Sequence, residues 1–204
     1  MTIFLFASSL IAVFVIAVNG KRQKKNQSQA EETFWDRERR ANSTRKRSLD
    51  GLEYITIPLE KFPTHILQQD SVVAECISTL EDLTSRKIVN LTGFTNTDLK
   101  LEYGTANITP LSEYDQNYTI LARTLQKWAD VLLDTGYTKE AAVLMEFAVS
   151  TGTDVSKTYY ELAEYYASQG EEEQIKRLKG LAGALHSSSR EIILRHLSKE
   201  YPEI

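Results

Sequence analysis

Two stretches of sequence decide the fold of this chain: residues 124–152 read TLQKWADVLLDTGYTKEAAVLMEFAVSTG, and residues 159–185 read YYELAEYYASQGEEEQIKRLKGLAGAL. In each stretch apolar residues recur three or four positions apart, a glycine interrupts the pattern, and a second apolar-periodic segment follows. The two glycines, Gly136 and Gly170, are 34 residues apart. Each stretch therefore predicts two helices joined by a tight turn.

The two stretches also match residue by residue when one is shifted by 34 positions. Large and small side chains coincide in these pairs: Leu125 with Tyr159, Trp128 with Leu162, Ala129 with Ala163, Leu132 with Tyr166, Ala141 with Ile175, Leu144 with Leu178 and Ala148 with Ala182. A fixed period with matched residue sizes is typical of stacked copies of one supersecondary unit.

These two copies resemble the tetratricopeptide repeat (TPR) family. The residues that carry the likeness are the small ones at positions of close helix packing, namely Ala129, Ala141, Ala148, Ala163 and Ala182. The chain departs from the family because no proline stands near Thr153 and because Ile175 replaces a small residue. The resemblance implies an all-α fold with two TPR-like hairpins over residues 122–189. The alternative is an ordinary pair of helical hairpins with a coincident spacing.

In the TPR family the first helix of each repeat lines a concave groove that binds a peptide or a partner helix. Position by position, the resemblance implies a partner-binding groove formed by Arg123, Gln126, Lys127, Asp130, Lys157, Tyr160, Glu161 and Glu164, with Leu194 and Arg195 from the last helix. Chaperone-binding members hold a terminal carboxylate with Lys and Asn, and Gln126 and Asp130 occupy those positions here. The implied ligand is a protein segment with both charges and an apolar anchor. The alternative is that these residues are simply exposed charges.

An apolar segment without charges occupies residues 2–18, within a predicted transmembrane anchor over residues 1–20. A helix of this length spans about 25 Å, slightly less than a hydrocarbon core, and large apolar residues favour its insertion. Lys21, Arg22, Lys24 and Lys25 follow at once, whereas nothing basic precedes Phe4. This arrangement favours an uncleaved anchor over a signal peptide and keeps the basic side in the cytoplasm. We therefore expect a single-pass plasma-membrane protein with a cytoplasmic carboxyl-terminal domain.

Five glycosylation sequons begin at Asn26, Asn42, Asn90, Asn107 and Asn117. With the basic flank in the cytoplasm, we interpret these asparagines as turn and cap residues, and a glycan on any of them would reverse the topology. Cys76 is the only cysteine, so the chain forms no intrachain disulfide and must fold by packing alone.

Residues 21–51 form a predicted basic juxtamembrane linker. Its basic character contrasts with the acidic remainder of the chain. Residues 1–47 contain ten Lys/Arg and four Asp/Glu, whereas the remainder has 14 Lys/Arg and 24 Asp/Glu. The acidic domain is therefore a poor match for nucleic acid. Within the linker, EETFWDRERRANSTRKR is a potential helix. Phe34 and Trp35 could lie on anionic lipid headgroups, or they could contact the domain from a solvated stalk.

Residues 52–121 are expected to form an extended strap and a helical amino-terminal cap on the first repeat. The strap should run from Leu52 to Pro63, followed by a helix from Asp70 or Ser71 to about Ser85. Capping boxes at Thr95–Asp98 and Ser112–Asp115 predict two further helix starts, and Gly104 is suited to end the first of these helices. Residues 190–204 should form a capping helix.

The stretches ANSTRKRSLDGLEYITIP and NLTGFTNTDLKLEYG also resemble a group of single-pass bacterial membrane proteins of uncharacterised function. No metal-binding or phosphate-binding motif accompanies His65, His186 or His196, so no cofactor, metal site or catalytic residue is predicted. The predicted function is a membrane-anchored scaffold or adaptor without enzymatic activity. A permanent structural subunit of a membrane assembly is the first alternative, and an enzyme with a site around His65 or His196 is the second.

Overall fold

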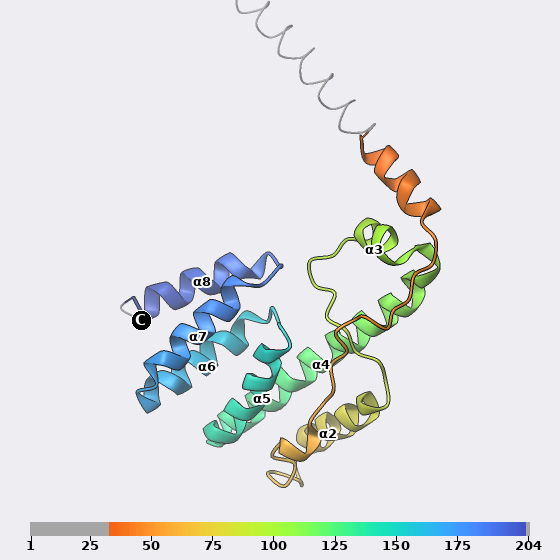
Figure 1. Ribbon diagram of the computed structural model, residues 1–204. Coiled ribbons are helices and arrows are strands. Elements are labelled where there is room, and N and C mark those ends of the chain that lie inside the picture. Colours follow the sequence, from red (N-terminus) through yellow and green to blue (C-terminus); the bar gives the residue numbers. More distant parts are fainter. Residues whose placement is uncertain (1–32, 203–204) are drawn as a thin grey trace, which may run out of the picture. The chain divides into compact units, whose positions relative to one another are not determined.

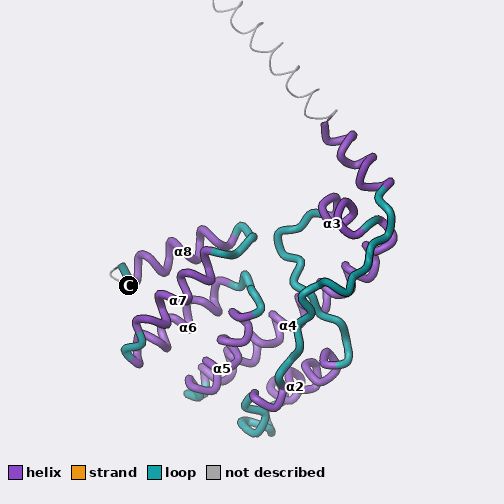
Figure 2. The backbone as a smooth tube through the Cα atoms, viewed as in Figure 1, coloured by secondary structure: helices purple, strands orange, loops and turns teal. Residues whose placement is uncertain are grey.

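The computed structural model describes residues 33–202, and these residues form helices and loops without a β-strand (Figures 1 and 2). The expected all-α fold is therefore confirmed for the described part of the chain. The structure divides into two compact units. We call residues 33–48 and 95–108 the small unit, and residues 49–94 and 109–202 the large unit. The sequence-based boundaries placed residues 33–48 in the linker and residues 95–108 in the amino-terminal cap.

The small unit contains a helix at residues 33–43, helix α3 (Asn96–Tyr103) and the short 3-10 helix η2 (Thr105–Asn107). Thr95 and Asp98 form the predicted capping box at the start of α3. Gly104 ends this helix with a φ of 87°, which a glycine adopts without steric cost. Both local predictions are confirmed.

The predicted strap of the large unit is extended and lies across the first hairpin. It includes the 3-10 helix η1 (Leu59–Lys61), and its Ile55 amide donates to the Ile88 carbonyl at 2.9 Å. Phe62 contacts the rings of Trp128 and Phe147 edge to face, at centroid distances of 6.2 and 5.3 Å. The strap thus buries a side of the hairpin that would otherwise face water.

Helix α2 (Ser71–Thr84) begins as predicted, with Asp70 as its N-cap. The Asp70 carboxylate accepts hydrogen bonds from the amides of Val72 at 2.8 Å and Val73 at 3.0 Å. Val73, Cys76, Leu80 and Leu83 form its buried face, so Cys76 is a core residue, as its position in the apolar pattern predicts.

Replacing Asp70 by alanine is expected to destabilise the protein by about 1 kcal/mol, since two amides at the helix start would lose their acceptor. Asp70→Asn should recover most of this loss, because an asparagine oxygen also caps helices well. Urea denaturation of the full chain in mild detergent would measure both. Equal losses from the two variants would contradict a capping role.

The long helix α4 (Ile108–Asp134) starts earlier than the sequence predicted. Ser112 and Asp115 do not cap it but lie inside it, and Pro110 occupies its first turn, where a missing amide hydrogen costs little. The Asp115 carboxylate instead accepts a hydrogen bond from the amide of Leu91 at 3.1 Å. The local sequence pattern was misleading because the partner of Asp115 comes from a distant loop.

Two helical hairpins follow in the large unit. The first joins α4 to α5 (Thr138–Ser150), and the second joins α6 (Ser156–Gln169) to α7 (Glu172–Gly183). The residues in all pairs matched by the 34-residue shift are buried, with exposed fractions of 4% or less. Gly136 and Gly170 both have positive φ, 86° and 71°.

The turns of the two hairpins also share their hydrogen bonds. The Tyr137 amide donates to the Leu132 carbonyl at 2.8 Å, and the Glu171 amide donates to the Tyr166 carbonyl at 2.9 Å. Each residue of the second bond lies 34 positions after its equivalent in the first. Such a bond beside a left-handed glycine is the usual way to satisfy the last carbonyls of a helix. The shared spacing thus extends from burial to the backbone of the turn.

Helix α8 (Ser189–Glu200) covers the second hairpin, packing against both α6 and α7 through Ile193 and Leu197. This position agrees with the predicted carboxyl-terminal cap. Among residues 33–202, no helix is both long and apolar enough to cross a membrane. The predicted anchor at residues 1–20 lies outside the described residues.

Candidate functional site

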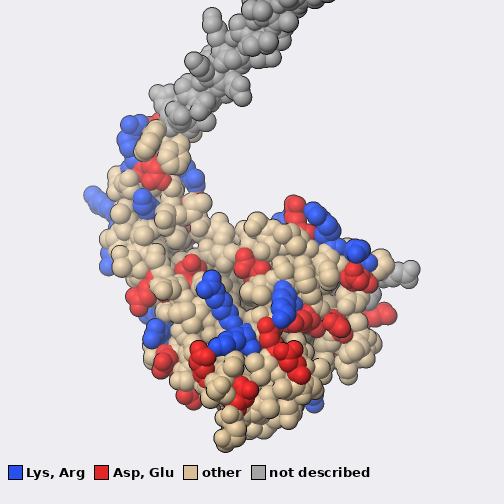
Figure 3. All heavy atoms as spheres, turned by 180° about the vertical axis from the view of Figure 1, so that it is seen from behind, with Lys and Arg blue, Asp and Glu red and all other residues tan. Residues whose placement is uncertain are grey.

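The residues proposed for the groove lie on α4, α6 and α8, on helix sides that differ from the buried one. Arg123, Lys127, Lys157, Glu164 and Arg195 are exposed, and Gln126, Asp130, Tyr160, Glu161 and Leu194 are partly buried. The charged side chains of both signs are interspersed on the surface of the molecule (Figure 3).

A polar network joins α4 to α6 within this set. The Gln126 amide donates to Asp130 at 2.5 Å and to Glu161 at 2.8 Å, and its oxygen accepts from the Thr158 hydroxyl at 2.5 Å. Lys157 forms ion pairs with Asp130 at 2.9 Å and with Glu161 at 3.4 Å. The hydrogen bond from Lys157 to Asp130 raises the pKa of the lysine. The network holds the two first helices of the hairpins side by side.

Thr158 is the member of this network that the sequence reasoning missed. It is 1% exposed, and Thr124, which lies 34 residues earlier, is also buried. This pair of matched threonines was a readable signal, because a polar residue repeated at a buried position needs a hydrogen-bond partner.

Two other proposed groove residues contact neighbouring helices. The Tyr160 ring lies against the His196 ring of α8 at a centroid distance of 3.7 Å and an interplanar angle of 33°, and Lys127 pairs with Glu75 of α2 at 2.7 Å. The hydrogen bond to Glu75 raises the pKa of Lys127. Both side chains therefore help to hold helices together, and a ligand would have to compete with these contacts.

The part of the face that is open to a ligand is smaller than the full set. Arg123, Glu164 and Arg195 are exposed and form no ion pair with another described residue. Glu161 and Glu164 also line a surface pocket of about 370 Å³ whose other walls are Leu133, Thr138, Tyr165 and Ser168. This pocket combines apolar walls with carboxylates, which suits a long basic side chain.

Three sequon asparagines have structural roles. The Asn90 side-chain amide donates to the carbonyls of Thr151 and Gly152, Asn107 donates to those of Arg47 and Tyr103, and Asn117 donates to that of Lys87. Asn107 and Asn117 are 1% and 4% exposed. A glycan on these nitrogens would displace the hydrogen bonds, so the fold itself uses the amides.

Neither His65 nor His196 forms a hydrogen bond or an ion pair with another described residue. His65 borders a shallow pocket of about 350 Å³ with Glu60, Lys61, Lys139 and Glu140, but no hydrogen bond links His65 to another described residue. Within residues 33–202 no group of three or more His, Cys, Asp and Glu side chains is placed to hold a metal ion. Burial raises the pKa of the Cys76 thiol, which disfavours the reactive thiolate.

Comparisons of the chain with protein-family models, with curated proteins and with solved structures gave no match. The proposed membrane-surface residues Lys21, Arg22, Lys24 and Lys25 lie outside the described residues.

Proposed function

We propose that this chain is a membrane-anchored scaffold or adaptor whose TPR-like hairpins bind a protein or peptide along the face formed by α4, α6 and α8. The matching of the two hairpins carries this proposal. Residues 34 positions apart agree in burial and in the hydrogen bonds of the turn. Stacked hairpins present the first helices of successive units side by side, and such faces commonly bind peptides.

The chemistry of the face indicates the class of partner. Arg123 and Arg195 supply free cations, and the pocket beside Glu164 supplies carboxylates next to the apolar side chains of Leu133 and Tyr165. A partner helix or extended segment with acidic residues and at least one long basic side chain would complement these groups. Nucleic acid is disfavoured because the large unit has 13 Lys/Arg against 21 Asp/Glu over its described residues.

The membrane part of the proposal is supported by the sequence of residues 1–25. The charge-free apolar segment followed by basic residues favours a single-pass anchor with the helical domain in the cytoplasm. The structural use of Asn90, Asn107 and Asn117 is consistent with a domain that carries no glycan at these positions.

A permanently packed subunit of a membrane assembly is the second candidate. An obligate interface is usually a continuous apolar patch. In the large unit, the large exposed apolar side chains are Phe94, Tyr137, Val143 and Ile192, which come from a loop, a turn, α5 and α8. This scatter favours a polar face used for reversible binding.

Charge reversal on the proposed face should reduce partner binding at least tenfold, equivalent to about 1.4 kcal/mol. The test variant combines Arg123→Glu, Glu164→Lys and Arg195→Glu, none of which removes an ion pair within the described residues. A photo-crosslinker at these positions in native membranes identifies the partner, and titration of that partner against the full chain gives the affinity.

The matched control places the same charge changes on the second helices of the hairpins, with Lys139→Glu, Glu172→Lys and Lys176→Glu, which are also exposed. This control should bind as the original chain does. Equal binding by both triple variants, with unchanged circular dichroism, would exclude the face on α4, α6 and α8 as the main binding surface.

A further inference from the structure

We infer that the helix at residues 33–43 is a membrane-docking element, which lays Phe34, Trp35 and the basic residues after them on an anionic lipid surface. This inference rests on the proposed membrane attachment, and it assigns a specific surface and ligand to the small unit. Four observations support it: the helix is held by contacts within the small unit, its aromatic side chains are exposed, four basic residues at its end and just after it form no ion pair within the described residues, and its distance along the chain from the apolar segment is short.

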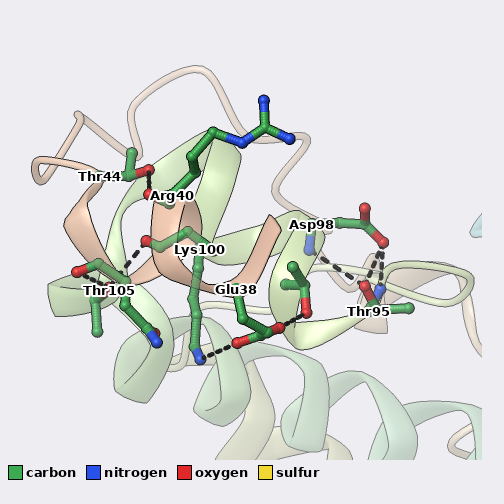
Figure 4. A network of polar contacts seen from close by, with 10 residues as sticks. Glu38, Arg40, Thr44, Thr95, Asp98, Lys100 and Thr105 are labelled. Carbon is green, nitrogen blue, oxygen red and sulfur yellow. Dashed lines mark hydrogen bonds and ion pairs between the residues drawn. The ribbon is translucent and has the colours of Figure 1, made fainter. Parts of the chain in front are cut away.

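The helix is fixed within the small unit by contacts to α3 and η2 (Figure 4). Arg37 pairs with Asp98 at 2.5 Å, and Glu38 contacts both Thr97 and Lys100. The hydrogen bond from Thr97 lowers the pKa of Glu38, so this carboxylate stays ionised. Ala41 is fully buried.

The segment after the helix is held in the same way. The Thr105 hydroxyl lies 3.3 Å from the Ala41 carbonyl and 3.4 Å from the Asn42 carbonyl, and Asn107 donates to Arg47 at 2.7 Å. Residues 33–48 are therefore a preformed surface and not a loose tether.

Two aromatic residues in the described part of this helix, Phe34 and Trp35, face solvent. Phe34 is 54% exposed and Trp35 is 60% exposed, and their rings contact each other edge to face at 5.4 Å. Trp35 and Arg39 are four residues apart and so share one side of the helix. Tryptophan beside arginine is the combination found where a protein meets lipid headgroups. Exposing two large aromatic rings to water is unfavourable unless something covers them.

Basic side chains at the end of this helix and just after it are available for an anionic partner. Arg40, Arg45, Lys46 and Arg47 are exposed and form no ion pair with another described residue. Over its described residues the small unit has seven Lys/Arg and four Asp/Glu, the reverse of the balance in the large unit. This charge excess matches the negative surface of a bilayer.

The length of chain before the helix permits this docking. The apolar segment ends at Val18, and the 15 residues between Val18 and Phe34 could span at most about 54 Å if fully extended. Phe34 and Trp35 are thus within reach of the headgroups of the bilayer that holds the anchor.

The test uses the full chain reconstituted in phosphatidylcholine vesicles with or without phosphatidylglycerol. Trp35 and Trp128 are the only tryptophans, and Trp128 is 0% exposed, so bromine-labelled lipids report on Trp35. We expect these lipids to quench the exposed tryptophan in vesicles with phosphatidylglycerol, and Trp35→Phe to abolish the quenched component. The double variant Arg40→Glu/Lys46→Glu should lose the quenching, whereas the control Lys139→Glu/Lys176→Glu should keep it.

Unquenched Trp35 emission in these vesicles would overturn the inference if the chain stays in the vesicle fraction after carbonate extraction. Protection of Trp35 from acrylamide without quenching by the labelled lipids would also overturn it, because a protein surface would then cover the rings. A chain that carbonate extracts, but whose Trp35 is quenched at neutral pH, would support the docking surface and contradict the anchor.

Discussion

Replacing Gly104 by alanine is expected to destabilise the small unit by roughly 2–6 kcal/mol. Its φ of 87° with a ψ of 150° lies in a region that side chains rarely adopt, at a cost of about 1–3 kcal/mol. An added Cβ would also lie 2.4 Å from the Arg45 carbonyl oxygen and 2.9 Å from the Lys46 Cα. These are backbone atoms, so relief requires the chain to move, and such overpacking costs about 1–3 kcal/mol more.

Hydrogen exchange of the full chain in vesicles would measure this effect. The Arg47 amide donates to the Tyr103 carbonyl at 3.0 Å and should lose protection in Gly104→Ala. Amides in the core of α6 and α7 should keep theirs, because those helices belong to the large unit. Unchanged protection at Arg47 would show that residues 44–48 do not pack on Gly104 as described.

Other glycines separate the two contributions. Gly170 has a φ of 71° but nothing lies within 4 Å of an added Cβ, so Gly170→Ala should cost only about 1–2 kcal/mol. Gly180 is exposed in α7 and an added Cβ there also meets nothing, so Gly180→Ala should stabilise by about 0.5–1 kcal/mol. If Gly104→Ala lowers the stability no more than Gly170→Ala does, the steric contact with Arg45 and Lys46 contributes nothing to the loss.

Replacing Trp128 by alanine should cost about 3–5 kcal/mol, which is a large part of the 5–15 kcal/mol that stabilises a typical domain. Trp128 is 0% exposed and contacts Phe62 of the strap edge to face. Truncation would leave a cavity between the strap and the first hairpin. Urea denaturation followed by far-UV circular dichroism, on the full chain in mild detergent, would measure the loss.

Two variants test the origin of that loss. The indole Nε1 of Trp128 has no hydrogen-bond partner among the described residues, so Trp128→Phe removes an unpaired buried donor. Its free energy of unfolding should therefore fall much less than that of the alanine variant. Val143→Ala trims a side chain of α5 that is 39% exposed and should stay within about 0.5 kcal/mol of the original chain. A Trp128→Ala loss near that of Val143→Ala would contradict the buried position of the ring.

The sequence was sufficient for features that depend on neighbouring residues. The glycine turns at Gly136 and Gly170, the capping box at Thr95 and the N-cap at Asp70 each rest on contacts within a few positions, and each is present. The buried faces of the hairpins were also readable, because helical periodicity and the 34-residue spacing pointed to the same positions.

Features that depend on distant partners could not be predicted. Asp115 has the sequence context of a capping residue, yet it accepts a hydrogen bond from Leu91, which lies 24 positions away. The small unit joins residues 33–48 to residues 95–108, and the sequence of neither stretch indicates that it packs against the other. In the candidate site, the charged positions followed from the TPR resemblance, but the pairing of Lys127 with Glu75 depends on how α2 packs.

The loop at residues 88–94 gives the large unit a property that a plain stack of hairpins lacks. In such a stack each unit contacts only its neighbours, so the hairpins can unfold one at a time from the ends. Here Asn90 holds the turn between α5 and α6, and the backbone of Gly93 lies against His186, between α7 and α8. A force applied to the carboxyl terminus would act on α8 and on these contacts of Asn90 and Gly93 together. The hairpins should therefore unfold in one event at a single force, and not one after another.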